Sequence, residues 1–318
     1  MVAVAFAIET NDLTKRYGSL TAVNKLNLKV KTNTIHGFLG PNGAGKTTAI
    51  KLLVGLLKPD GGTISIFGQE VFGDRPDVRL RMGYMPELPK FPKHLTGYEL
   101  LDIYGKMYGL NVHERREQIP ELLETVGLQD RGRDHIGKYS KGMQQRIGIA
   151  QALVSNPELV IMDEPSLGLD PVGMVEVREI MKAIAKGGIT VFISSHLLHE
   201  VQQVCSDITV INRGITIASD TLENLSDQLL GPSTLKVEVT KLTDVIVKNV
   251  KKLPFVSSVS KEDNKLIIQV EKQEDVRPQV SEAVTKSGGV IVTMNLKERN
   301  LEDVFMKLII KSKGAKTK

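Results

Sequence analysis

The residues with the clearest chemistry lie in the segment GPNGAGKTT at 40–48. Gly40, Gly45, Lys46 and Thr47 have the spacing of a P-loop, in which glycines allow a tight turn that exposes backbone N–H groups to phosphates. The lysine of such a loop reaches the β- and γ-phosphates, and the hydroxyl group after it binds Mg²⁺. The apolar run TIHGFL directly before the loop is the strand that a P-loop needs, which argues against a glycine-rich turn without a ligand. The residues expected to contact the nucleotide are Gly40, Pro41, Asn42, Gly43, Ala44, Gly45, Lys46, Thr47 and Thr48.

Two carboxylates follow the apolar run LVIM at 159–162, a pattern typical of a buried parallel strand. We expect Asp163 to hold Mg²⁺ together with Thr47. We expect Glu164 to orient and deprotonate the water that attacks the terminal phosphate. An acidic pair in this position is otherwise solvated or caps a helix, and the P-loop is what favours the catalytic interpretation.

A histidine ends a third apolar run, ITVFISS at 189–195. An isolated histidine is usually a core or surface residue, but at the end of a strand beside Asp163 we expect His196 to contact the γ-phosphate. A zinc site formed with His199 is a further alternative. The sequence HLLHE fits neither the HExxH nor the HxxEH zinc pattern, so we exclude it.

A second segment, YSKGMQQR at 139–146, also has the features of a phosphate site. It places Ser140 and Gly142 where we expect a helix to start, and a helix start offers backbone N–H groups to anions. One nucleotide does not need two such sites in one chain, so this second site requires a separate explanation.

The elements that position these residues follow from the hydrophobic pattern of the first 220 residues. Short apolar runs alternate there with helical patterns, which predicts βαβ units and an α/β fold with a mainly parallel sheet. In open α/β sheets, ligands bind beyond the carboxyl ends of the strands. We therefore expect the P-loop, the acidic pair and the histidine to form one shared site.

A long insert separates the P-loop from the acidic pair. Its proline-rich start, PELPKFPKHLT, must be irregular. Thr96 and Glu99 have the spacing of a capping box that opens a helix, and a second helical pattern follows at 113–128. We expect a helical subdomain at about 88–150 inside an ATP-binding domain at 1–225.

The pattern changes after about residue 230. The order strand, helix, two strands joined by a turn at 262–264, helix and strand predicts a small α+β domain of the ferredoxin-like kind at 230–312. A final helical stripe at 300–310 and a basic tail at 313–318 end the chain. We find no catalytic constellation in this second domain.

Composition restricts the class of protein. The 318 residues are 41% hydrophobic and 25% charged, as in ordinary globular proteins, and the net charge is +5. The single cysteine, Cys205, excludes an intrachain disulfide and is expected to be buried. The run VAVAFAI at 2–8 lacks the basic start and cleavage site of a signal peptide and is expected to be a strand. No apolar stretch reaches the ~18 residues of a membrane span.

The order of the motifs resembles the ATP-binding subunits of ABC transporters, which share a P-loop NTPase fold. YSKGMQQR resembles the family's LSGGQ signature, with matches at Ser140 and Gly142 and departures at Tyr139, Lys141 and Met143. The resemblance covers roughly residues 8–220 and implies ATP and Mg²⁺ as the bound groups.

The same resemblance assigns two further residues. Tyr17, in KRYGSL, matches the aromatic residue that stacks on adenine, and Asp170, in SLGLD, matches the carboxylate of the D-loop. Glu87, in GYMPE, stands where the family generally has a glutamine that touches Mg²⁺ and the attacking water. The ABC-2-type exporter branch often has this GYxPE sequence, so Glu87 is expected to have a catalytic and metal role, with an ordinary loop acid as the alternative.

In this family two subunits pair head to tail, which explains the second site. Ser140 and the amide of Gly142 are expected to meet the γ-phosphate of the ATP held by the other subunit, identical or not. The resemblance further implies a separate membrane permease driven by closure of the pair, and a cytoplasmic location on the inner face of the cell membrane. The prolines after Glu87, with Lys90 and Lys93, are expected to face that permease or the lipid headgroups, although a solvated loop also explains them.

Two other functions are less consistent with the sequence. An ABC-type ATPase acting on nucleic acid or ribosomes would have a long coiled coil or two cassettes, and an aromatic content of 4% without tryptophan leaves little to stack bases on. We therefore expect no nucleic-acid partner. A GTPase would need an NKxD motif after the P-loop, whereas the NK pair at Asn24 precedes it and continues LN.

Overall fold

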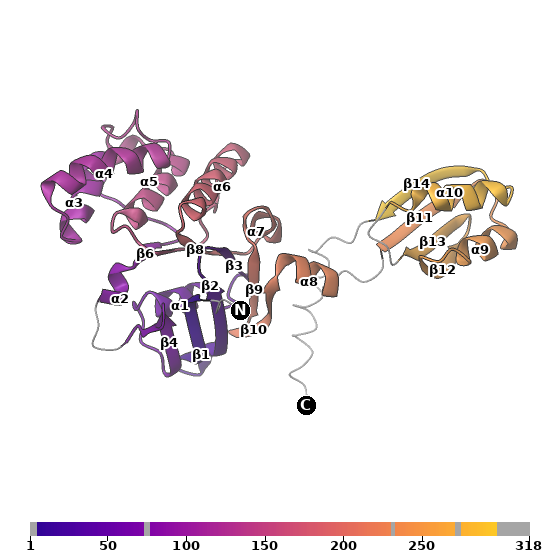
Figure 1. Cartoon of the computed structure of the whole chain (residues 1–318), viewed down its shortest axis with the longest axis horizontal. Helices are drawn as coiled ribbons and strands as arrows, with labels where there is room; N and C mark the ends of the chain where they lie inside the picture. Colours follow the sequence, from indigo (N-terminus) through magenta and orange to yellow (C-terminus); the bar gives the residue numbers. More distant parts are fainter. Residues whose placement is uncertain (1–4, 73–76, 230–232, 271–274, 298–318) are drawn as a thin grey trace. The chain divides into compact units, whose positions relative to one another are not determined.

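The computed structural model of the protein describes residues 5–72, 77–229, 233–270 and 275–297. The chain divides into two compact units, Met1–Leu222 and Glu223–Lys318, coloured from indigo to orange and from orange to yellow in Figure 1.

The described residues of the first unit include a six-stranded sheet in the order β10-β9-β3-β8-β7-β6. Strands β3, β6, β7, β8 and β9 run parallel, and β10 is antiparallel to β9. The three runs expected to share a site are therefore neighbours, and their carboxyl ends meet at one edge. The bounds are β3 Ile35–Leu39, β6 Met82–Met85, β7 Leu159–Met162, β8 Thr190–Ser195, β9 Asp207–Asn212 and β10 Ile215–Thr221.

The prediction of a mainly parallel sheet is correct for these strands and wrong for a second sheet. That sheet is wholly antiparallel, in the order β2-β1-β4-β5. A tight turn with φ of 57° at Gly18 joins its two long strands, and such a turn forces antiparallel pairing. The bounds are β1 Phe6–Tyr17, β2 Leu20–Lys31, β4 Gly61–Ile66 and β5 Gln69–Glu70.

Helix α1, Lys46–Leu53, shares one apolar core with both sheets. The ring of Phe38 on β3 lies in this core, 5.5 Å from the ring of Phe192 on β8. Successive strand residues face opposite sides, so the preceding residue, Gly37, faces helix α7. A side chain at Gly37 would collide with Val201 of that helix, and Cys205 lies beside it, buried as expected. Helices on this side of the sheet are α6 Pro171–Lys186 and α7 Leu198–Val204.

His36 is the buried polar residue of strand β3. Its Nε2 lies 2.9 Å from Thr209 Oγ1 on β9, and its Nδ1 has no hydrogen-bond partner in the described part of the chain. Burial lowers the pKa of His36 to about 4, against a smaller opposing effect of the Asp207 carboxylate. The imidazole is therefore neutral at physiological pH.

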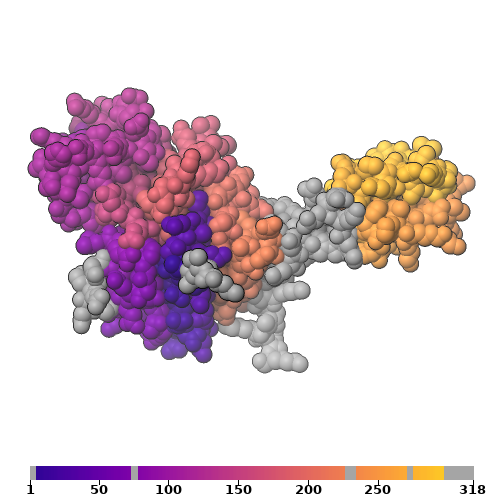
Figure 2. Space-filling model, in the orientation of Figure 1, coloured from indigo at the N-terminus to yellow at the C-terminus, as the bar shows by residue number. Residues whose placement is uncertain are grey.

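The insert forms a helical lobe within the first unit, shown in magenta in Figure 2. Its first helix opens at the predicted capping box: Thr96 Oγ1 accepts from the N–H of Glu99 at 3.2 Å, and the Glu99 carboxylate accepts from the N–H of Thr96 at 2.8 Å. The helices of the lobe pack on one another. Their bounds are α3 Gly97–Met107, α4 Val112–Thr125, the short 3₁₀ helix Ile136–Lys138 and α5 Lys141–Leu153; a short helix α2, Asp77–Leu80, precedes them.

The second unit has the predicted ferredoxin-like order. Its sheet is antiparallel with strand order β12-β13-β11-β14, and its own apolar residues, among them Leu235, Ile246, Val250 and Val280, form a core under the helices. The bounds are α8 Leu222–Leu229, β11 Ser233–Val239, α9 Asp244–Lys251, β12 Val256–Glu262, β13 Lys265–Val270, α10 Arg277–Lys286 and β14 Ile291–Lys297. The helix and tail expected at 300–310 and 313–318 lie outside the described residues. Of the helices within the described ranges, none is both long and apolar enough to cross a membrane.

Candidate active site

The loop between β3 and α1 is held in place from two sides. The N–H of Gly40 donates to the carbonyl of Ser195 at the end of β8, at 3.2 Å, and the carbonyl of Ala44 accepts from the N–H of Gly214 in the β9–β10 turn, at 2.8 Å. Gly45 has φ of 103°, and a side chain there would collide with the carbonyl oxygen of Ala22. The sequence therefore needs glycine at this position for both conformation and space.

The loop presents backbone donors. Within the described residues, six amides at the loop and the start of α1 donate to no backbone carbonyl: those of Asn42, Gly43, Gly45, Lys46, Thr47 and Thr48. The first turn of α1 has no acidic residue, so its positive helix end is not neutralised. This arrangement suits an anion with several oxygens, such as a chain of phosphates.

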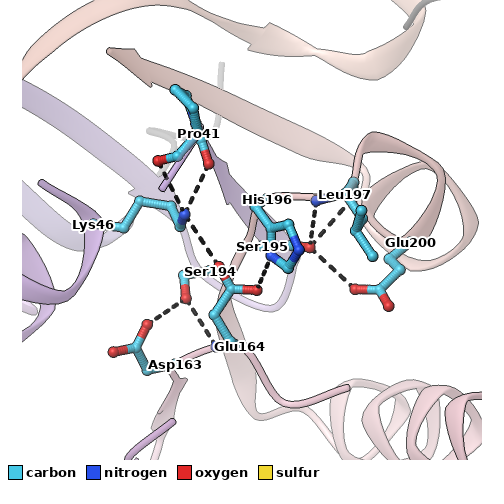
Figure 3. A network of polar contacts seen from close by, with 10 residues as sticks. Pro41, Lys46, Asp163, Glu164, Ser194, Ser195, His196, Leu197 and Glu200 are labelled. Atoms are coloured by element: carbon cyan, nitrogen blue, oxygen red, sulfur yellow. Dashed lines mark hydrogen bonds and ion pairs between the residues drawn. The ribbon is translucent and has the colours of Figure 1, made fainter. Parts of the chain in front are cut away.

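Lys46 lies buried beneath this loop, with 6% of its side chain exposed. Its ammonium donates to the carbonyl of Gly40 at 2.7 Å and lies 3.1 Å from Oε1 of Glu164 (Figure 3). Glu164 also has only 8% of its side chain exposed, so the two charges compensate each other away from water.

The other carboxylate oxygen of Glu164 lies 2.8 Å from Nδ1 of His196 (Figure 3). Lys46, Glu164 and His196, predicted from three separate segments, thus meet at the carboxyl ends of β3, β7 and β8. Glu164 has a left-handed backbone with φ of 49°, which is unusual for a residue with a side chain and typical of functional sites.

A serine that sequence reasoning left without a role connects the acidic pair to β8. Ser194 Oγ donates to Asp163 Oδ1 at 2.6 Å and accepts from the N–H of Glu164 at 2.9 Å (Figure 3). One buried hydroxyl therefore binds both the carboxylate of Asp163 and the backbone of Glu164. The signal available in the sequence was the pair of serines that ends the apolar run, which the residue types alone do not connect to a partner.

Asp163 retains one oxygen for a ligand. Its Oδ2 is buried and has no hydrogen-bond partner among the described residues. A buried carboxylate oxygen without a donor is costly unless a cation or a water binds it. The side chain of Asp163 therefore fits Mg²⁺, which prefers carboxylate and hydroxyl oxygens as ligands.

Glu87 follows strand β6 and is half-buried. Its charge, like that of Asp163, affects the side chain of Tyr84. Burial, together with smaller effects of the negative charges of Asp163 and then Glu87, raises the pKa of Tyr84 to about 12. Both carboxylates therefore act on one phenol, which brings Glu87 into the electrostatic environment of Asp163. Tyr84 itself was not a predicted site residue.

Ser140 and Asp170 begin helices. Ser140 Oγ accepts from the N–H of Met143 at 3.2 Å as the N-cap of α5, and Asp170 accepts from the N–H of Gly173 at 2.7 Å as the N-cap of α6. The predicted helix start in YSKGMQQR is therefore present. Gly142 follows in the first turn of α5.

The remaining predicted residues are not joined to the cluster. Tyr17 is the last residue of β1, with 47% of its surface exposed. In the part of the chain that is described, no hydrogen bond or ion pair connects Tyr17, Ser140 or Gly142 to Lys46 or Glu164. The structure of one chain thus contains two separate candidate phosphate sites.

The chain is similar to known ATP-binding proteins over most of its length. The sequence matches the family model ABC transporter over residues 23–167 and the model ATP-binding protein DrrA1-3-like, C-terminal domain, over residues 221–309. The bacitracin transport ATP-binding protein BcrA of Bacillus licheniformis is 38% identical over 95% of this chain and 97% of its own. The daunorubicin resistance ATP-binding protein DrrA2 of Streptomyces coeruleorubidus is 33% identical over 95% of each chain. A solved structure of an ATP-binding subunit of an ABC transporter is 32% identical, with a TM-score of 0.63, over 70% of this chain and 92% of that one.

Proposed function

Because this chain belongs to the family of ABC transporter ATP-binding subunits, we propose that Lys46, Glu164 and His196 form its centre of ATP hydrolysis. The protein is an ATPase of the ABC-2 exporter branch, and its hydrolysis of ATP powers a separate membrane permease. One relative is named for bacitracin transport and another for daunorubicin resistance, which supports export. The observation that carries the site assignment is the buried contact of the Glu164 carboxylate with both Lys46 and His196.

ATP binding begins with an exchange at Lys46. The phosphates are held by the free loop amides and replace Glu164 as the partner of the ammonium. This exchange leaves Glu164 Oε1 without its cation, beside the terminal phosphate. Glu164 then accepts a proton from the water that attacks the γ-phosphorus, and the bond to the ADP oxygen breaks. His196 holds the other carboxylate oxygen in place and contacts the γ-phosphate.

Mg²⁺ would be held by Thr47 and Asp163, with Glu87 accepting from its bound water. When bound, it supplies positive charge against the phosphate oxygens. The unpartnered Oδ2 of Asp163 supports this assignment. Ser194 bonds both the Asp163 carboxylate and the backbone of Glu164. The metal ligand and the general base are therefore held at fixed positions relative to each other.

A second ATP-binding subunit completes each site in this proposal. Ser140 and the amide of Gly142 meet the γ-phosphate held by the other subunit, and Asp170 lies at the same interface. Tyr17 stacks on the adenine. Closure is favoured because ATP gains these contacts only in the closed pair. The separation of the two candidate phosphate sites within one chain supports this arrangement.

The permease docks beside the proline-rich segment that follows Glu87, on the inner face of the membrane. A cavity of about 370 Å³ lies there between β6 and the helical lobe. Aromatic and basic side chains line it, among them Tyr84, Lys90, Phe91, Tyr104 and Tyr108. These side chains suit a short apolar segment of a partner.

The test is light scattering of purified Glu164→Gln with and without ATP and Mg²⁺. We expect the variant to bind ATP without hydrolysing it and to double in mass only when ATP and Mg²⁺ are present. A variant that stays monomeric at saturating ATP would contradict the paired arrangement. Phosphate release at the parental rate would instead contradict the role of Glu164.

A further inference from the structure

The loop that carries His196 is held by a residue outside the site described so far. Ser195, directly before the histidine, is buried, with 2% of its surface exposed. Its Oγ accepts from the N–H of Leu197, directly after the histidine, at 3.0 Å. The backbone on both sides of His196 is therefore tied to one hydroxyl group.

That hydroxyl group has its own partner in helix α7. Ser195 Oγ lies 3.0 Å from Oε2 of Glu200 and 3.3 Å from the carbonyl oxygen of Leu197 (Figure 3). The hydroxyl group has a single proton to donate, and the Glu200 carboxylate is the nearer of the two acceptors. A hydrogen bond to a carboxylate is stronger than one to a neutral carbonyl. Glu200 thus fixes the orientation of the hydroxyl group that closes the turn around His196.

The position of Glu200 in α7 explains why it reaches this serine. Leu197 is the N-cap of α7 and, in the described structure, its side chain caps nothing. Glu200 occupies the third helical position, from which a glutamate usually bonds the backbone N–H of the N-cap. Here Ser195 takes that N–H, and Glu200 bonds the serine instead. Glu200 therefore caps the start of α7 indirectly, through Ser195, which is the residue directly before His196.

Glu200 is also electrically coupled to the catalytic centre. Burial raises the pKa of the Glu200 carboxyl, and the hydrogen bond from Ser195 and the charge of His199 oppose this increase. Smaller effects come from the catalytic centre, where Glu164 raises this pKa and His196 lowers it. Glu200 lies in the same polar network as Glu164 and His196 in Figure 3, with Ser195 and His196 between the two carboxylates.

We propose that Glu200 is a positioning residue for ATP hydrolysis: through Ser195 it holds the turn at 195–197 so that His196 Nδ1 stays on the carboxylate of Glu164. This inference rests on the proposed roles of His196 and Glu164. Glu200 acts through Ser195 and not on the phosphate loop, so its loss changes the placement of His196 while leaving that loop intact.

The experiment compares ATP turnover and ATP binding for Glu200→Ala, Glu200→Gln and Ser195→Ala in the full chain. We expect kcat to fall about 10- to 100-fold for Glu200→Ala, because small misplacements of a catalytic group have effects of that size. The dissociation constant for ATP should stay within about twofold. Glu200→Gln should recover most of the rate, since its amide oxygen also accepts from Ser195. Gln202→Ala, an exposed position on the same helix, is the matched control and should leave the rate unchanged.

A double-mutant cycle with His196→Ala separates positioning from simple helix capping. If Glu200 acts through His196, Glu200→Ala adds no further loss in the His196→Ala background. Losses that multiply would overturn the inference, as would a full rate in Glu200→Ala. Ser195→Ala provides the same comparison if Glu200→Ala does not fold. If His196→Ala alone keeps the parental rate, the proposed role of His196 is wrong and the inference is wrong with it.

Discussion

The ammonium of Lys46 and the carboxylate of Glu164 form a buried ion pair, with Nζ and Oε1 3.1 Å apart. The residue that should bind phosphate is therefore paired with the residue that should activate water. In the proposed function, phosphate competes with Glu164 for Lys46, so the affinity for ATP depends on the difference between these two interactions.

Glu164→Gln should lower the turnover of ATP by about 10²- to 10⁴-fold, the range that a general base contributes. Affinity for ATP should be equal or higher, because an uncharged amide competes less for Lys46 than a carboxylate does. Phosphate release and equilibrium binding of ATP measure the two effects.

Glu179→Gln is the control for this change, because Glu179 is an exposed glutamate on α6 that pairs with Lys182. Glu179→Gln should alter neither the turnover of ATP nor the affinity for ATP. Weaker ATP binding by Glu164→Gln than by the parental chain would contradict the competition between carboxylate and phosphate.

Lys46→Ala should abolish tight ATP binding and also destabilise the nucleotide-free chain. It leaves the buried carboxylate of Glu164 without its cation, a loss of about 3–5 kcal/mol for a buried pair. Thermal unfolding without nucleotide and equilibrium binding of ATP measure the two consequences.

The double variant Lys46→Ala with Glu164→Gln separates the loss of ATP binding from the loss of stability. It removes both charges, so it should regain stability relative to Lys46→Ala while still failing to bind ATP. Tight binding by either variant would refute the phosphate role of Lys46. Equal stability of the single and double variants would refute the importance of the ion pair.

Ser140→Asp should block ATP-driven pairing without weakening the fold. Aspartate is a good N-cap and keeps the bond to the N–H of Met143, so α5 should stay stable. Its negative charge would repel the γ-phosphate of the other subunit. The expected result is an unchanged melting temperature and unchanged binding of one ATP, with no doubling of mass in light scattering.

Ser140→Thr keeps both the cap and the hydroxyl group and should pair nearly as the parental chain does. If Ser140→Asp hydrolyses ATP at the parental rate, the N-terminus of α5 is not a phosphate site.

His36 should make the first unit less stable in acid. The pKa of His36 is about 4 in the folded chain, whereas the ordinary value of 6.5 applies to the unfolded chain. Between these two pH values, the imidazole is protonated in the unfolded chain and neutral in the folded one. Stability from this group is present above pH 6.5 and is lost as the pH falls toward 4, by up to about 3 kcal/mol. Denaturant unfolding at pH 7 and pH 5 measures the slope.

His36→Gln removes the titration and should flatten this slope, whatever its effect at pH 7. His113→Gln replaces an exposed histidine on α4 and should leave the slope as it is. An identical slope for His36→Gln and the parental chain would show that the burial of His36 has no effect on acid stability.

Local patterns in the sequence were enough to predict that Lys46, Glu164 and His196 lie together. The glycine spacing at 40–48 and the apolar runs before Asp163 and His196 identify strand ends, and parallel strands bring such ends to one edge. The ferredoxin-like order of the second unit followed from alternation and turns in the same way.

Partners across strands could not be predicted. Ser194 reaches Asp163, and Ser195 reaches Glu200, only through the register of β8 with its neighbours and the start of α7. No spacing in the sequence encodes the pairing of Lys46 with Glu164, which joins residues that follow two different strands. The antiparallel sheet was missed because periodicity identifies a strand without identifying the strand it pairs with.

The second unit encloses an apolar core made of its own residues. Heating should therefore melt the chain as two cooperative blocks, giving two heat-absorption peaks in a calorimeter where a single-core protein gives one. ATP binds the native first unit, so adding it should move one peak to higher temperature while the other stays in place. The thermogram would then show directly which part of the polypeptide responds to ATP.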